Sequence, residues 1–233
     1  MTSSIPAVDT RPAQGRGLQA VLLDMDGTLV DTEDIWWAAE VEVFAALGHV
    51  LDGEHRAIVV GGPMARSLGH LMAVTGTEVT LPELSAAINA RFVELIARGV
   101  PLMPGARRLL TELAAHQVPT ALVSASHRHI IDSVLRTLGA ENFAFTLAGD
   151  EVARTKPFPD PYLLAAARLG AEPTRCVVVE DTPTGVASAE AAGCQVVAVP
   201  SIVPIESAPG RTVVASLEQL SVPFLRSLNA TVH

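Results

Sequence analysis

The sequence has few aromatic residues, few cysteines and no excess of positive charge. Aromatic side chains make up 4% of the 233 residues and hydrophobic residues 49%, so the core is expected to consist mainly of small and medium aliphatic side chains. The formal net charge is −9, and no run of Lys or Arg occurs. This balance excludes the basic surface that nonspecific binding of nucleic acid or of an anionic membrane requires.

The cysteines and the N-terminal segment indicate a reducing compartment. Cys176 lies in an apolar run and Cys194 lies in the turn before another, as is typical of buried thiols that form no disulfide. The N-terminal segment lacks the apolar stretch of a secretory signal. No window has the roughly 18 apolar residues of a membrane span. We therefore predict a cytoplasmic protein without a membrane segment, present as a monomer or weak dimer.

Short apolar runs predict strands that are buried on both faces. The strong runs cover residues 20–23, 120–124, 176–180 and 195–199, and a weaker one covers 143–147. Helical patterns lie between them, at residues 106–116, 128–138, 161–169 and 184–192. This alternation predicts right-handed crossovers and a doubly wound, Rossmann-like α/β core with five or six parallel strands.

The segment 32–101 departs from this alternation. It contains helical patterns and no convincing strand, with helices expected at residues 33–47, 54–60, 64–74 and 82–98. We interpret it as an all-helical cap inserted after the first strand. The α/β core then comprises residues 19–31 and 102–233. Residues 1–18, which are rich in Thr, Ser, Pro, Gln and Gly, are expected to form a disordered arm.

Polar residues stand at the ends of the predicted strands. Asp24 ends the first strand, two residues before Asp26 and a glycine turn; Ser124 ends the second, and Glu180 and Asp181 end a third. In open parallel sheets, ligands bind beyond these carboxyl ends. Carboxylates that lie so close repel one another, so the arrangement favours a divalent cation, in particular Mg²⁺.

Two further segments are expected to reach the same edge. Lys156 lies on a proline-flanked loop, in a chain with few lysines. Ser124 and the backbone N–H groups that follow it, beginning with Ala125, open a helix and suit a phosphate group. We interpret Ser126 and Asp160 as N-caps of the helices that follow them. Taken singly, Asp24 is explained equally well as a capping residue, and Lys156 is better explained as a solvated loop charge; their combination favours a site.

The motifs together resemble a known superfamily. Asp24-x-Asp26-Gly, Ser124, Lys156 and the Glu180-Asp181 pair occur in the order and spacing of the four motifs of the haloacid dehalogenase superfamily. Over residues 20–220 the chain resembles the β-phosphoglucomutase-like phosphatase branch. The resemblance implies an α/β core with a mobile helical cap, Mg²⁺ as cofactor, and phosphatase activity on a small phosphorylated metabolite such as a sugar, polyol or short acid phosphate.

The resemblance also assigns roles to the matching residues. Asp24 would be the nucleophile that becomes phosphorylated, and Asp26 the general acid and base. The transferring phosphoryl group would be held by Thr28, Ser124, Ala125 and Lys156. The metal would be held by Asp24, the backbone carbonyl of Asp26, Glu180 and Asp181, with Glu180 in direct contact or one step behind. Cap residues Trp36 and Arg66 are candidates for substrate specificity, whereas His127 and Arg128 are expected to be solvated.

Other functions are weighed against the phosphatase. β-Phosphoglucomutase has a cap histidine at the position that matches Trp36 here, and a cap arginine at a position that falls near Ala65. This sequence has neither side chain at these places, so a sugar-phosphate mutase is disfavoured. A phospho-receiver domain also gathers acids on a doubly wound sheet, but it lacks a helical insertion and would accept one phosphoryl group without turnover. A haloacid dehalogenase has no need of Asp26. A transport ATPase would require membrane spans.

Overall fold

The computed structural model describes residues 17–59 and 64–229, without the side chains of residues 59 and 64–66. The predicted arm at residues 1–18 lies almost entirely outside the described residues. The described chain forms one six-stranded parallel sheet in the order β3-β2-β1-β4-β5-β6. The strands are β1 (Ala20–Leu23), β2 (Thr120–Val123), β3 (Phe145–Leu147), β4 (Cys176–Glu180), β5 (Gln195–Ala198) and β6 (Arg211–Val213). The predicted doubly wound α/β fold is confirmed.

Alternate side chains of the central strands enter two separate apolar clusters. In β1, Ala20 and Leu22 join one cluster, and Val21 and Leu23 join the other. A strand that is apolar at every position therefore satisfies both faces of the sheet, which explains the continuous hydrophobic runs. β6 lies at the sheet edge and is only half-buried. Its sequence, Arg-Thr-Val, lacks that signal, so the apolar pattern does not predict this strand.

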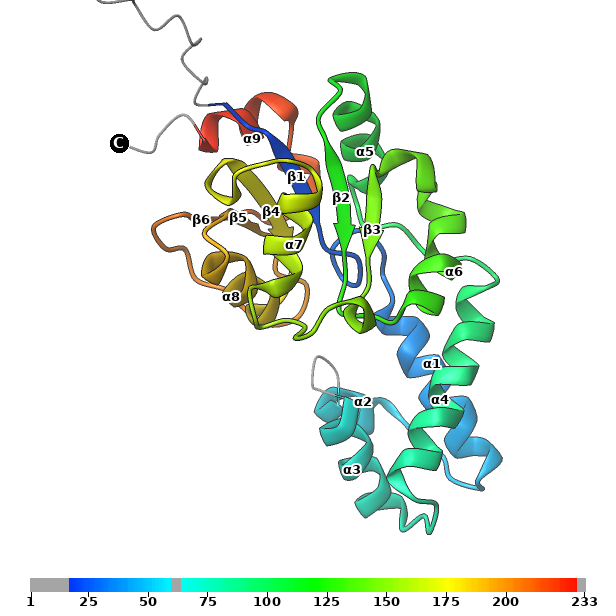
Figure 1. The fold of residues 1–233 in the computed structure, drawn as a ribbon. Helices are drawn as coiled ribbons and strands as arrows, with labels where there is room; N and C mark the ends of the chain where they lie inside the picture. Colours follow the sequence, from blue (N-terminus) through cyan, green and yellow to red (C-terminus); the bar gives the residue numbers. More distant parts are fainter. Residues whose placement is uncertain (1–16, 60–63, 230–233) are drawn as a thin grey trace, which may run out of the picture.

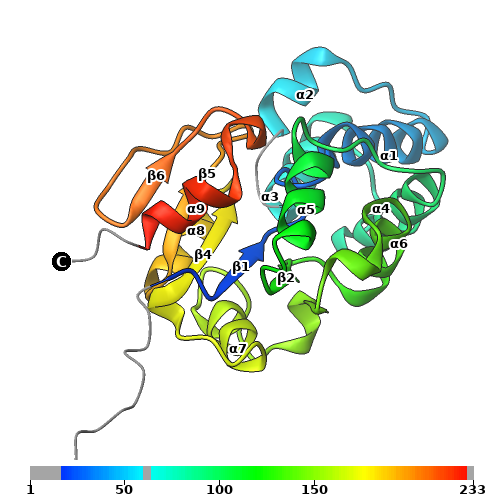
Figure 2. The ribbon, with the colours of Figure 1, turned by 90° about the horizontal axis from the view of Figure 1, so that it is seen from above.

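Helices cover both faces of the sheet (Figure 2). One cluster contains residues of α5 (Ala106–Ala115), α6 (Arg128–Leu138) and α9 (Val222–Leu228), and the other contains residues of α7 (Asp160–Arg168) and α8 (Pro183–Ala191). Four of these five helices were predicted, each within one residue of its observed bounds, which is the usual uncertainty of helix ends.

The remaining long helices lie beyond the carboxyl ends of the strands (Figure 1). They are α1 (Glu33–Ala46), α2 (Gly53–Val59), α3 (Met64–Thr75) and α4 (Leu81–Ile96). Trp36 of α1 stacks on Phe92 of α4, with ring centroids 3.7 Å apart. The four helices were predicted, but the division into cap and core stays a prediction, because one apolar cluster runs from these helices into the sheet.

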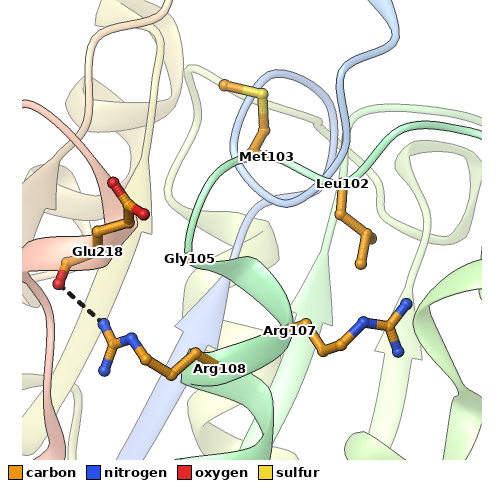
Figure 3. A pocket seen from close by; sticks show the side chains of 6 residues that line it. All are labelled: Leu102, Met103, Gly105, Arg107, Arg108 and Glu218. Atoms are coloured by element: carbon orange, nitrogen blue, oxygen red, sulfur yellow. Dashed lines mark hydrogen bonds between the residues drawn. The ribbon is translucent and has the colours of Figure 1, made fainter.

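A cavity of about 730 Å³ opens beside the first turn of α5 (Figure 3). Its lining comprises Leu102, Met103, Gly105, Arg107, Arg108 and Glu218. Gly105 has φ 89°, and a Cβ there would lie 2.5 Å from the backbone N of Glu218, so only glycine fits. None of the predicted site residues lines this cavity.

Within the described ranges, no helix has the length and apolar character needed to cross a membrane.

Candidate active site

Asp24 and Lys156 meet at the carboxyl edge of the sheet. Asp24 follows β1, and its backbone N–H donates to the carbonyl of Val179 in β4 at 3.1 Å, which anchors it between the two strands. Lys156 is the only lysine of the sequence. Its Nζ donates to Asp24 Oδ1 at 2.6 Å, to Glu180 Oε1 at 2.6 Å and to the carbonyl of Val123 at 2.9 Å. The loop lysine is therefore ion-paired with the acids at this edge. The group formed by Asp24, Lys156, Glu180 and Asp181 is called the acidic cluster below.

The electrostatics of the pair follow from burial and crowding. Burial and then the charge of Glu180 raise the pKa of Asp24 well above its usual range, while Lys156 opposes the shift. For Lys156, burial lowers the pKa of the ammonium, but Asp24 and Glu180 outweigh burial and raise it above its ordinary value. Lys156 therefore stays charged, and the cluster keeps one fixed positive group.

Glu180 is surrounded by hydrogen-bond donors. Its Oε1 accepts from Lys156 and from the hydroxyl of Tyr162, both at 2.6 Å, and its Oε2 accepts from Thr182 at 3.3 Å. Burial, followed by the charge of Glu180, raises the pKa of Tyr162 well above its usual range, so the phenol remains a donor. Gly185 leaves the room for this carboxylate, because a Cβ there would lie 1.9 Å from Oε1. Glu180 thus holds Lys156 in place.

Asp181 completes a group of acids with the donor chemistry of a divalent-cation site. Asp24, Glu180 and Asp181 are buried, and each offers an oxygen within 4.8 Å of the others. Burial is the main cause that raises the pKa of Asp181 to about 6, against the hydrogen bond from Ser201. Three carboxyl groups face a single ammonium, so acidic groups outnumber basic ones in this cluster. Buried carboxylate oxygens are ligands for hard divalent cations, and the residues fit such an ion.

Two neighbours orient Asp181. Thr28 donates to Oδ1 at 3.3 Å and Ser201 donates to Oδ2 at 2.6 Å. Gly27, with φ 77°, lies so close that a Cβ would be 2.1 Å from Oδ2. Thr28 was predicted to hold phosphate, and in the structure its hydroxyl faces Asp181.

Asp26 is held by three hydroxyl groups. Thr32 donates to Oδ1 at 3.0 Å, and Ser126 and Ser124 donate to Oδ2 at 2.8 Å and 3.2 Å. Ser124 therefore lies beside Asp26, as the shared sheet edge predicts. The assignment of Ser126 as an N-cap is wrong: His127 is the N-cap of α6, and the Ser126 hydroxyl binds Asp26. As a cap this hydroxyl would accept from a neutral backbone N–H group; here it donates to a carboxylate, and a charge-assisted bond of this kind is stronger than a neutral one.

Asp160 is likewise no N-cap. Pro159 takes that position, and Asp160 is the first residue of α7, with no side-chain bond to the helix backbone. Its carboxylate instead accepts hydrogen bonds from Arg154 at 3.1 Å and 3.0 Å. A bidentate guanidinium pair replaces the single capping bond that the sequence pattern predicts.

The other predicted residues take varied positions. Ala125 is exposed, and its carbonyl lies against Gly149. Arg128 is more than a solvated charge: it donates to Glu151 and to Thr146, both at 2.6 Å. The stacking of Trp36 accounts for one face of its ring, so its role in specificity stays a prediction. His127 is exposed. The side chain of Arg66 lies outside the described residues.

Five residues that hydrogen-bond to the predicted acids were not predicted as site residues, namely Thr32, Ser126, Tyr162, Thr182 and Ser201. Ser201 follows β5 and could have been found by the strand-end rule used for Ser124. Tyr162 lies on a helix that covers the sheet, and nothing in the spacing distinguishes it from a core aromatic. Its contact with Glu180 depends on how α7 packs.

Comparison with known proteins gives a consistent result. The family model described as haloacid dehalogenase-like hydrolase matches residues 21–199. The chain is 35% identical to protein CbbY of Rhodobacter capsulatus over 196 residues, covering 79% of this chain and 86% of the relative. It is 34% identical to hexitol phosphatase A of Escherichia coli over 216 residues, covering 86% and 92%.

A solved structure shares the fold. CbbY from Rhodobacter sphaeroides, crystallised as an aspartate-to-asparagine variant with xylulose 1,5-bisphosphate, has a TM-score of 0.71 and 28% identity, covering 87% of this chain and 96% of that one. The predicted enzyme class, a phosphatase, is confirmed by relatives at this similarity. The chain belongs to the haloacid dehalogenase-like hydrolase family.

Proposed function

We propose that this protein is a Mg²⁺-dependent phosphatase that hydrolyses a small phosphorylated sugar or polyol through a phospho-aspartate on Asp24. The observation that carries the proposal is the contact of Lys156 with Asp24 and Glu180, beside Asp181. The carboxylate that would attack is thus already paired with the ammonium that would neutralise the phosphoryl oxygens. Charge neutralisation and alignment are what phosphoryl transfer requires.

The reaction follows from the positions of Asp24 and Asp26. An oxygen of Asp24 attacks phosphorus, and the bond from phosphorus to the substrate oxygen breaks. Asp26 gives its proton to the departing alkoxide, so the alcohol leaves neutral. Asp26 then takes a proton from a water molecule, whose oxygen attacks phosphorus and releases Asp24 and inorganic phosphate. Two moderate steps replace one slow displacement.

The residues that would hold Mg²⁺ are Asp24, Asp181 and the backbone carbonyl of Asp26. When bound, the ion supplies positive charge that neutralises the phosphoryl oxygens. Glu180 would act one step behind, because Lys156, Tyr162 and Thr182 already occupy its oxygens. Thr28 and Ser201 would keep Asp181 oriented, since both donate to its carboxylate.

The relatives support a sugar or polyol as the substrate. One is named a hexitol phosphatase, and another binds xylulose 1,5-bisphosphate. A short acid phosphate stays within the predicted substrate range. The cytoplasmic location and the state as a monomer or weak dimer remain predictions.

The substitution Asp24→Asn tests the nucleophile. The amide keeps the shape of the side chain but cannot attack phosphorus, so turnover of p-nitrophenyl phosphate with Mg²⁺ should fall by about 10³-fold or more. Asp132→Asn, at an exposed acid of α6, is the matched control and should retain full activity. Activity of Asp24→Asn within about tenfold of wild type would refute the assignment.

The same assay separates the alternatives. Repeated release of phosphate distinguishes an enzyme from a receiver domain, which would take up one phosphoryl group per chain and stop. Incubation with β-glucose 1-phosphate, Mg²⁺ and a trace of glucose 1,6-bisphosphate distinguishes a phosphatase from a mutase. Free phosphate should accumulate faster than glucose 6-phosphate, and the opposite order would favour the mutase.

A further inference from the structure

Glu40 is a buried carboxyl group outside the cluster at the sheet edge. It lies in α1 and is 9% exposed, and among the described residues it has neither a hydrogen-bond nor an ion-pair partner. Burial and then the negative charge of Glu33 raise its pKa to about 7. A buried polar group without a partner opposes folding. Such a group requires an explanation other than stability.

The neighbours of Glu40 on α1 are apolar. Residues four positions apart share a helix face, which places Glu40 between Trp36 and Phe44. Trp36 stacks on Phe92 of α4, and Phe44 is fully buried. Both side chains also belong to or pack against one apolar cluster. The stem of Glu40 therefore packs inside the helical layer formed by α1 to α4.

The carboxylate oxygens of Glu40 are nevertheless reachable. In the described part of the chain, the sealed side-chain polar atoms that lack a partner are Thr155 Oγ1 and Asn229 Oδ1. The oxygens of Glu40 are not among them. Since they also have no partner among the described residues, a hydroxyl group that reaches them can form a hydrogen bond.

The position of Glu40 along α1 relates it to the catalytic edge. The helix begins after Thr32, whose hydroxyl binds Asp26 at 3.0 Å. Glu40 follows eight residues later, about 12 Å along the helix axis. Side chains of a helix tilt toward its N-terminus, so the carboxylate of Glu40 leans back toward Asp26. An extended sugar or polyol phosphate can bridge that span.

We propose that Glu40 is a specificity-determining residue that hydrogen-bonds a hydroxyl group on the leaving group of the substrate. The inference rests on the proposed phosphatase function and narrows its substrate class. A carboxylate accepts from a hydroxyl group, and its protonated form also donates to one. As an acid, Glu40 offers no positive charge that could pair with a second carboxylate or phosphate on the substrate. The substrate class is therefore a phosphorylated polyol or sugar whose leaving group is uncharged and rich in hydroxyl groups.

The experiment compares substrates with and without hydroxyl groups. The probes are sorbitol 6-phosphate and glucose 6-phosphate, p-nitrophenyl phosphate, which has no hydroxyl on its leaving group, and phosphoglycolate, which carries a carboxylate. The variants are Glu40→Leu, which keeps an apolar packing volume, and Glu40→Gln, which keeps the shape. Glu42→Gln, at an exposed acid of the same helix that pairs with Arg91, is the matched control.

Loss should depend on the substrate. Glu40→Leu should lower kcat/KM for the better of the two hydroxyl-rich substrates by about 10- to 100-fold and leave p-nitrophenyl phosphate within about threefold. Glu40→Gln should show a smaller loss of the same kind, and Glu42→Gln should show none. Thermal unfolding reports whether each variant is folded, and Glu40→Gln decides the question if the leucine variant is not.

Three results would overturn the proposal: equal loss for all substrates, no loss in either variant of Glu40, or a wild-type preference for phosphoglycolate over both hydroxyl-rich substrates. A wild-type enzyme that releases phosphate from none of the four compounds would contradict the phosphatase function itself. The two failures are therefore distinguishable.

Discussion

At the scale of single residues, one ammonium group, that of Lys156, pairs with two of the acids of the site. Lys156 pairs with Asp24 and Glu180, and Asp181 relies on the hydroxyl groups of Thr28 and Ser201. The ammonium stays protonated because its two carboxylate partners outweigh burial. Glu40 is a buried acid without a comparable partner among the described residues, and we expect this difference to affect stability.

The stability gained by Glu40→Leu should depend on pH. Folded Glu40 keeps its proton up to pH of about 7, whereas the unfolded chain releases it near 4.5. Ionised Glu40 therefore opposes folding above pH 7, and the opposition fades as pH falls toward 4.5. The free energy of unfolding should rise by about 2 kcal/mol more at pH 8 than at pH 5. Urea unfolding of both proteins at the two pH values measures this, and an equal gain at both would contradict a raised pKa.

At the scale of elements, close contacts between helices and strand ends place the acids. α8 starts at Pro183, with only its N-cap Thr182 between it and the Glu180-Asp181 pair, and its glycine at position 185 lies against the Glu180 side chain. α5 is joined to the 3₁₀ turn η4 (Leu217–Gln219) by Arg108. Substitutions at these contacts should affect the site and the fold in different ways.

Gly185→Ala should disturb the site through Glu180. The new Cβ would lie 1.9 Å from Oε1, so Glu180 or α8 must move, and Lys156 loses a partner. We expect a loss of about 2 kcal/mol in the free energy of unfolding and a fall in kcat. Gly69→Ala in α3 is the matched control: a Cβ there meets nothing within 4 Å, so helix propensity should add about 0.5–1 kcal/mol. Chemical unfolding and p-nitrophenyl phosphate turnover measure both; an unchanged kcat in Gly185→Ala would contradict the positioning role.

Arg108 and Arg107 form a second matched pair beside the cavity (Figure 3). Arg108 donates to the carbonyls of Leu217, Glu218 and Leu220 at 3.0, 3.0 and 2.6 Å, whereas no described residue bonds the guanidinium of Arg107. Arg108→Ala should lower the free energy of unfolding by about 1–2 kcal/mol, and Arg107→Ala by less than about 0.5. Equal effects in urea unfolding would show that the three bonds contribute nothing specific.

At the scale of the whole molecule, the charged residues of the site come from distant parts of the chain. Asp24 follows β1, Asp181 follows β4, and Lys156 lies on the loop before α7. Folding brings their charges together, so folding and the binding of a cation at this edge should be linked.

Magnesium should therefore affect both activity and stability. Turnover should be lost in EDTA and restored by excess Mg²⁺, and Ca²⁺ should inhibit because its larger coordination shell alters how the Asp24 carboxylate is held. Thermal unfolding should shift upward with Mg²⁺ in the wild type and much less in Asp181→Asn. Full turnover in chelator, or the same shift in both proteins, would refute the metal site.

The sequence alone determined five of the six strands and the members of the acidic cluster. Strands buried on both faces must be apolar throughout, so the runs before Asp24, Ser124 and Glu180 were readable without a structure. Neighbouring parallel strands end at one edge, so the polar residues that follow them had to meet there. Helices α5 to α8 could also be predicted from the sequence, because the apolar periodicity of each helix and the glycine after it lie within one short segment.

Only the tertiary structure decided the partners of these residues. Ser126 and Asp160 carry local capping signals, but a carboxylate and an arginine brought near by folding offer stronger bonds. Tyr162 reaches Glu180, Thr32 reaches Asp26, and Glu40 becomes buried through the packing of whole helices. Such contacts depend on distances between segments far apart in the chain, and local propensity carries no information about those distances.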